Sequence, residues 1–123
     1  IDKQGGIDSL YAITYAARVA HELGADVVKV NFPNGTNQYC PEPYRNLELS
    51  FDQQLHKIMR AAGHTFVIFS GGSKISRDEL LGRVRAGMEQ GGTGVIFGRN
   101  VWQRPFDEAM GLAHDMGSIL KEF

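Results

Sequence analysis

The stretch DVVKVNF at residues 26–32 is short, rich in β-branched residues and followed at once by Pro33. Such a run predicts a buried β-strand. Two similar runs, TFVIF at residues 65–69 and TGVIF at residues 93–97, predict a second and a third strand. Glycines follow both runs within two residues, which is typical of a chain that leaves a sheet and turns.

Apolar residues recur at three- and four-residue spacings around these strands, and this spacing predicts helices. Asp8 is the expected N-cap of the first helix, and the pairs Ser50 with Gln53 and Ser76 with Glu79 match the capping box that opens many helices. The expected helices cover residues 8–23, 50–63, 76–91 and 105–123.

The order of these elements is a helix followed by three strand-helix repeats, which specifies a parallel α/β sheet. Two architectures fit this order. One is the C-terminal part of a (β/α)8 TIM barrel, with three parallel strands and four helices; the other is a small doubly wound parallel sheet. A length of 123 residues favours the doubly wound sheet, because a whole barrel needs about 250 residues. The motifs described next favour the barrel.

The composition excludes several classes of function. Thirteen basic against fourteen acidic residues give a net charge of −1 without a basic run, so we expect no nucleic acid or membrane surface as a partner. No apolar run is long enough to span a membrane. The single Cys40 cannot form an internal disulfide, which indicates a reducing compartment and a cytoplasmic protein, and no Cys/His spacing predicts a metal site.

Lys29 lies within the first predicted strand. Because side chains alternate along a strand, Val28 and Val30 share one face while Lys29 and Asn31 share the other. In a barrel, Lys29 would point into the lumen near the carboxyl end of its strand, where partial removal from water would free its amine to attack a carbonyl. Asn31 would be a hydrogen-bond partner for a substrate hydroxyl. The alternative for Lys29 is a structural ion pair with Asp26 or exposure at the surface.

Glycine-rich turns follow the second and third strands. The carboxyl ends of parallel strands meet at one edge of the sheet, so we expect these turns to lie side by side. Their backbone N–H groups, a hydroxyl and a guanidinium would together suit a phosphate. The alternative is that the glycines only make tight turns. The candidate phosphate-binding residues are Ser70, Gly71, Gly72, Gly98 and Arg99.

The motifs GADVVKVNF, VIFSGGSK and GGTGVIFGRNVWQ occur in this order, and together they resemble the last three βα units of the class I fructose-bisphosphate aldolases of the archaeal, DhnA-related type. The resemblance implies that residues 1–123 are the C-terminal portion of a single TIM-barrel aldolase domain. It implies that Lys29 forms a Schiff base with a ketose and that the five residues above bind the substrate phosphate. It also implies homo-oligomers, a sugar phosphate as the small-molecule partner, and no metal or cofactor.

The activity implied by this resemblance is the reversible cleavage of fructose bisphosphate to dihydroxyacetone phosphate and glyceraldehyde 3-phosphate. Three alternatives stay open. They are a related lysine-dependent aldolase or synthase acting on another phosphorylated ketose, a thiolase acting on a phosphorylated signal molecule, and a non-catalytic phosphate-binding fragment. The family's acid/base tyrosine and aspartate lie on earlier strands, so no residue here takes those roles. The proline-rich loop at residues 33–46 leaves the substrate range open.

Overall fold

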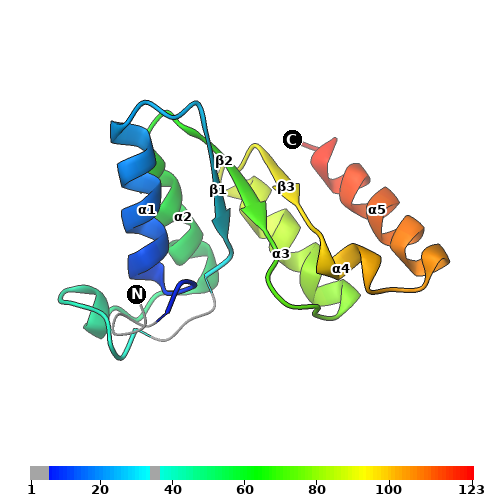
Figure 1. Ribbon diagram of the computed structural model, residues 1–123, viewed down its shortest axis with the longest axis horizontal. Coiled ribbons are helices and arrows are strands. Elements are labelled where there is room, and N and C mark those ends of the chain that lie inside the picture. The colour runs from blue at the N-terminus through cyan, green and yellow to red at the C-terminus, as the bar shows by residue number, and fades with distance from the viewer. Residues whose placement is uncertain (1–5, 34–36) are drawn as a thin grey trace.

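A computed structural model describes residues 6–33 and 37–123 of the chain. A parallel sheet of three strands, in the order β1-β2-β3, packs against the helices of the chain (Figure 1). The elements are α1 (Leu10–Glu22), β1 (Val27–Asn31), the 3-10 helix η2 (Tyr44–Asn46), α2 (Phe51–Ala62), β2 (Phe66–Ser70), α3 (Arg77–Glu89), β3 (Gly94–Ile96), α4 (Arg99–Trp102) and α5 (Phe106–Leu120).

The helices cover only one face of the sheet. Val30, Val67 and Phe69 point to this covered face and are buried. On the other face, the strand register sets Val27 beside Phe66, and these side chains are 50% and 59% exposed. A sheet with helices on one face only agrees with the prediction that these residues are part of a TIM barrel. A doubly wound sheet, in contrast, has helices on both faces. We call the uncovered side the open face.

Two hydrophobic clusters hold the helices in place. The larger cluster joins α1 and α2 to β1 and β2, and its centre includes Phe32 stacked on Phe69 with ring centroids 4.8 Å apart. The smaller cluster joins α3 to α5 through Leu80, Val84 and Leu112. Burial of such side chains contributes roughly 1.5–3 kcal/mol each, so these contacts dominate the stability of the fold.

A serine is the N-cap residue of each of the helices α1, α2 and α3. Ser50 and Gln53 form both hydrogen bonds of the predicted capping box. Ser76 accepts from the backbone N–H of Glu79, but the Glu79 carboxylate binds Arg83 at 2.7 Å, so only half of that predicted box forms. The predicted cap of α1 is wrong by one residue, because the hydroxyl of Ser9, not Asp8, accepts from the first turn.

Two short helices were not predicted from the spacing of apolar residues. The four-residue helix α4 fills the turn after β3, and η2 interrupts the predicted loop at residues 33–46. Residues 34–36 of that loop lie outside the described residues. Each of these helices makes about one turn, and one turn carries no measurable apolar period.

The C-terminal turn of the chain is tied to α3. Arg85 binds both carboxylate oxygens of Glu122, at 2.7 and 2.9 Å. Hydrogen bonding to Arg85 lowers the pKa of the Glu122 carboxyl from its ordinary value, and the same contact raises the pKa of Arg85. Across the described part of the chain, the helices are too short or too polar to cross a membrane.

Candidate active site

Lys29 lies on the open face of β1, as the alternation of its neighbours predicted. Its side chain is exposed, since no described element covers this face of the sheet. The partial burial that was expected for Lys29 in a barrel is therefore not provided by the described residues. Of the two alternatives considered above, surface exposure describes Lys29 in the described segments, and an ion pair with Asp26 is absent from them. Lys29 instead borders a pocket of about 190 Å³, the lysine pocket, together with Asn31 and one side of α1.

A second pocket, the glycine pocket, opens where the strands end. It encloses about 180 Å³, and Gly71 and Gly72 from the turn after β2 face Arg99 from the turn after β3 across it. The two turns thus meet at one edge of the sheet, as parallel strands require. The lining is completed by Ile7, Asp8, Asn31, Phe32, Ser73, Ile75, Leu80, Arg83 and Asn100.

Two of the predicted phosphate-binding residues do not line this pocket. Ser70 is 4% exposed, and its hydroxyl donates a hydrogen bond to Oδ1 of Asn31. Gly98 precedes α4, where an added Cβ would lie 3.3 Å from Nε1 of Trp102. The strand register sets Ser70 beside Asn31, and no local sequence pattern reveals this hydrogen-bond partner.

Close packing explains why the turn after β2 contains glycine. A Cβ on Gly71 would lie 2.6 Å from the ring of Phe97 and 2.7 Å from the amide nitrogen of Asn100. The Asn100 amide in turn donates to the carbonyl of Ser73 and accepts from the N–H of Ile75. Gly71 therefore lets the β2–α3 turn lie directly on α4.

Two charged residues of the glycine pocket, Arg83 and Asp8, were not among the predicted site residues. Arg83 extends from α3 and lies 5.9 Å from the ring of Phe51, with 23% of its side chain exposed. Its position three residues after Leu80, on the same side of α3, is the signal that could have identified it. Asp8 was expected to cap α1, but its carboxylate instead accepts from Nδ2 of Asn31 at 2.7 Å.

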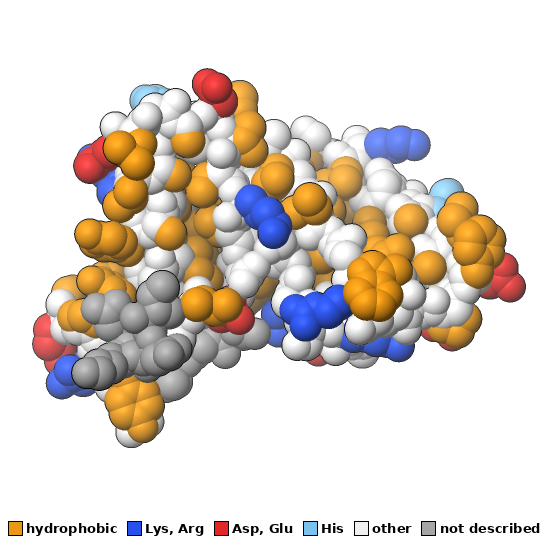
Figure 2. Space-filling model, viewed as in Figure 1, with side chains coloured by type: hydrophobic (Ala, Val, Ile, Leu, Met, Phe, Trp, Pro, Cys, Tyr) orange, Lys and Arg blue, Asp and Glu red, His pale blue; other side chains and the backbone are white. Residues whose placement is uncertain are grey.

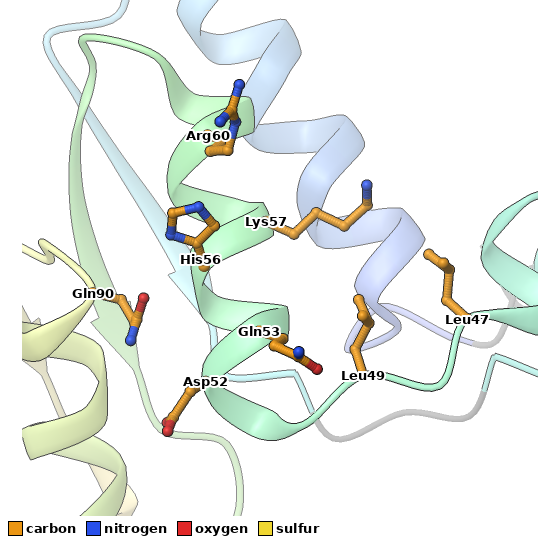
Figure 3. A pocket seen from close by; sticks show the side chains of 8 residues that line it. All are labelled: Leu47, Leu49, Asp52, Gln53, His56, Lys57, Arg60 and Gln90. Atoms are coloured by element: carbon orange, nitrogen blue, oxygen red, sulfur yellow. The ribbon is translucent and has the colours of Figure 1, made fainter.

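A pocket larger than both of these lies elsewhere. It measures about 490 Å³ and follows the outer side of α2, where His56, Lys57 and Arg60 project beside Leu47 and Leu49 (Figure 3). None of the predicted site residues borders it. Size alone therefore does not identify the candidate site, since most of the predicted site residues border the two smaller pockets at the strand ends.

The described residues contain no group of three or more His, Cys, Asp or Glu side chains that could hold a metal ion. The polar groups around the two pockets are an amine, two guanidiniums, one carboxylate, one hydroxyl, amides and backbone groups. Such a set can bind an anion and can attack a carbonyl.

Comparison with known proteins decides the family. A model of the DeoC/LacD family aldolases matches residues 2–104. The chain belongs to this aldolase family. The match includes both pockets and all three strands of the sheet.

Individual proteins similar to this chain are also named aldolases. The chain is 41% identical over 92 residues to the class 1 fructose-bisphosphate aldolase of Halobacterium salinarum, covering 75% of the chain and 29% of that protein. It is 32% identical over 113 residues to the fructose-bisphosphate aldolase/6-deoxy-5-ketofructose 1-phosphate synthase of Methanocaldococcus jannaschii, covering 91% of the chain and 32% of that protein. The chain thus spans about a third of the length of these curated relatives.

Solved structures confirm the predicted fold class. An archaeal fructose-1,6-bisphosphate aldolase whose catalytic lysine is covalently bound to the carbinolamine intermediate matches with a TM-score of 0.71 and 28% identity, covering 94% of this chain and 39% of that one. A further crystal structure of an archaeal aldolase matches with a TM-score of 0.73 and 28% identity, covering 96% and 40%. The three strands and their helices are therefore part of a TIM barrel.

Proposed function

We propose that the intact protein is a class I fructose-bisphosphate aldolase that forms a Schiff base on Lys29. The observation that carries this proposal is the placement of an amine and a pocket lined by two glycines and two guanidiniums at the same edge of the sheet. Lys29 borders one pocket, Gly71, Gly72 and Arg99 line the other, and Asn31 lines both. A ketose phosphate has both a carbonyl and a phosphate, and these residues offer an amine for the first and guanidiniums for the second.

Binding of the phosphate would come first. The guanidinium of Arg99 and the N–H groups of Gly71 and Gly72 would hold the phosphate on C1 of the ketose. Ser70 and Gly98 adjoin these residues and would shape the two turns. Fixing the phosphate would orient the C2 carbonyl toward Lys29, so that a reaction between two molecules becomes a reaction within one complex.

The chemistry would then proceed at Lys29. Its Nζ adds to the C2 carbonyl to give a carbinolamine, and loss of water gives a protonated imine. The C3–C4 bond breaks, its electron pair moves into the imine to form an enamine, and the C4 hydroxyl gives its proton to a base as glyceraldehyde 3-phosphate leaves. Protonation of the enamine at C3 and hydrolysis release dihydroxyacetone phosphate. We assign the base to the barrel strands that this chain does not include.

The proposal extends to the domain, the assembly and the location of the whole protein. Residues 1–123 would form the C-terminal portion of one TIM-barrel domain, in a homo-oligomer located in the cytoplasm. A second candidate activity is synthesis with another phosphorylated ketose, since the relative from Methanocaldococcus jannaschii is named both an aldolase and a synthase.

Borohydride trapping tests the proposal. Borohydride reduces an imine to a stable amine, so the intact protein treated with fructose bisphosphate and borohydride should gain one sugar phosphate on Lys29. Lys29→Met should lose the adduct and lower the cleavage rate by about 10³-fold or more, because no other group replaces the nucleophile. The readouts are intact mass, peptide mapping and a coupled triose phosphate assay.

Lys121→Met is the matched control, because Lys121 is an exposed lysine at the end of α5. It should keep both the adduct and the activity. An adduct on a lysine other than Lys29, or cleavage that survives Lys29→Met, would refute the proposed mechanism. Phosphate binding without any adduct would favour the non-catalytic alternative.

A further inference from the structure

Asn31 lies at the boundary between the two pockets of the candidate site. It lines the lysine pocket together with Lys29, and it lines the glycine pocket together with Gly71 and Arg99. Asn31 and Lys29 share the open face two residues apart on β1, which separates their Cα atoms by about 7 Å. A ligand bound to the amine of Lys29 would therefore have the carbons next to its carbonyl within reach of the Asn31 amide.

The Asn31 amide is held between two neighbours. Its Oδ1 accepts the hydroxyl proton of Ser70, which the strand register sets directly opposite on β2. Its Nδ2 donates to Oδ1 of Asp8 at 2.7 Å. A carboxylate can only accept and the Ser70 hydroxyl uses its one proton here, so the two contacts fix which end of the amide is nitrogen and which is oxygen.

Half of the hydrogen-bonding capacity of this amide is left for a ligand. An asparagine amide has two N–H donors and an oxygen with two lone pairs. Within the described residues, Asp8 takes one donor and Ser70 takes one lone pair, which leaves one donor and one lone pair. These two groups belong to a side chain that borders both pockets.

The remaining donor and acceptor match a hydroxyl better than a phosphate. A phosphate dianion offers only acceptors, so the free lone pair on Oδ1 would repel it. A hydroxyl accepts from Nδ2 and donates to Oδ1 at the same time. In a phosphorylated ketose the hydroxyl nearest the reacting carbonyl is on the adjacent carbon, on the side away from the phosphate.

We propose that Asn31 recognises the hydroxyl next to the reacting carbonyl of a phosphorylated ketose, and that Asp8 is a positioning residue that orients the Asn31 amide. This inference rests on the proposed function, because it requires a ketose bound covalently at Lys29. It makes the site specific for α-hydroxy ketone phosphates and disfavours the same ketone without the hydroxyl. Ser70 then acts through Asn31, and its hydroxyl proton is not available to the phosphate.

A pair of ligands tests the specificity directly. Dihydroxyacetone phosphate carries the hydroxyl, and acetol phosphate is the same ketone phosphate without it. Apparent dissociation constants for both come from the concentration dependence of borohydride trapping at Lys29 in the intact protein. The unaltered protein should prefer dihydroxyacetone phosphate by about 10-fold, which is the size of one or two neutral hydrogen bonds.

Substitutions assign that preference to the amide. Asn31→Ala should abolish the preference by weakening only the hydroxylated ligand, with trapping of acetol phosphate unchanged. Asp8→Ala should reduce the preference, and Asp8→Asn should restore most of it, since an amide oxygen can still accept from Nδ2 of Asn31. Asn46→Ala is the matched control, because Asn46 is an exposed asparagine whose amide binds Glu42 away from both pockets.

Four results would overturn the inference. Equal trapping of the two ligands in the unaltered protein, or a preference that survives Asn31→Ala, would refute it and leave the proposed aldolase function intact. Loss of acetol phosphate trapping in both Asn31→Ala and Asp8→Ala would show that these residues only maintain the fold of the site. No adduct at Lys29 with either ligand would refute the proposed function and the inference together.

Discussion

The two adjacent glycines of the turn after β2 have different structural roles. A Cβ on Gly71 would clash with Phe97 and Asn100, whereas a Cβ on Gly72 would meet nothing within 4 Å. We predict that Gly71→Ala destabilises the intact protein by about 1–3 kcal/mol, the usual cost of overpacking, and weakens the binding of inorganic phosphate. Urea unfolding and calorimetric titration with phosphate measure both effects.

Gly72→Ala is the control for this prediction. The backbone at Gly72 does not have a positive φ, so alanine fits there without strain and should leave the unfolding midpoint unchanged or slightly raised. Equal stability of the two variants would contradict the role assigned to Gly71.

At the scale of single residues, the sequence predicted the faces of the strand but not the partners of its side chains. The period of two correctly placed Lys29 and Asn31 on the open face. The hydrogen bonds of Asn31 to Asp8 and Ser70 join residues 23 and 39 positions apart, and no local pattern encodes such contacts. The roles of Lys29 and the phosphate-binding residues stay predictions, which trapping and substitution can test.

At the scale of elements, α4 holds the turn that forms the glycine pocket. Asn100 on α4 is 1% exposed, and it bonds to Ser73 and Ile75 of the β2–α3 turn. Arg104, just beyond α4, donates to the carbonyl of Ile75 at 2.6 Å. A short helix without a period of its own thus determines the position of the neighbouring turn.

We predict that Asn100→Ala frees this turn. The N–H of Ile75 loses its acceptor, which costs about 1–3 kcal/mol where the group stays out of water. Amide hydrogen exchange of Ile75 should accelerate, and exchange in the centre of α2 should not change. Unchanged protection of Ile75 would show that other contacts hold the turn. Asn46→Ala again serves as the control, since its amide is exposed.

The longer elements were predictable because their signals are local. α1, α2, α3 and α5 begin and end within a few residues of the expected bounds, and each of the three strands is found. Capping serines and terminal glycines supply these signals, as in the complete capping box of Ser50 and Gln53. The shift of the α1 cap from Asp8 to Ser9 has a physical cause, because the Asp8 carboxylate is engaged by Asn31.

At the scale of the whole molecule, the open face of the sheet lacks a cover in the described residues. Hydrophobic side chains gather on this side of the molecule over the strands (Figure 2). Val27, Phe66 and Ile96 are 50%, 59% and 48% exposed, and β1 and β3 each have a single neighbouring strand. Parallel sheets are normally buried on both faces. In the relatives, which are about three times as long, further chain is available to complete a barrel.

We therefore predict that residues 1–123 alone self-associate through the open face. Exposed apolar surface next to unpaired strand edges favours contact with a second copy. Phe66→Lys places a charge at the centre of this surface, so it should reduce both association in sedimentation velocity and the binding of a hydrophobic dye. Phe106→Lys is the matched control, because Phe106 is 76% exposed at the start of α5, away from the strands, and its replacement should leave association unchanged. If the unaltered 123 residues sediment as a monomer and bind no dye, then the open face is stable in water, and the argument that further barrel strands must cover it fails.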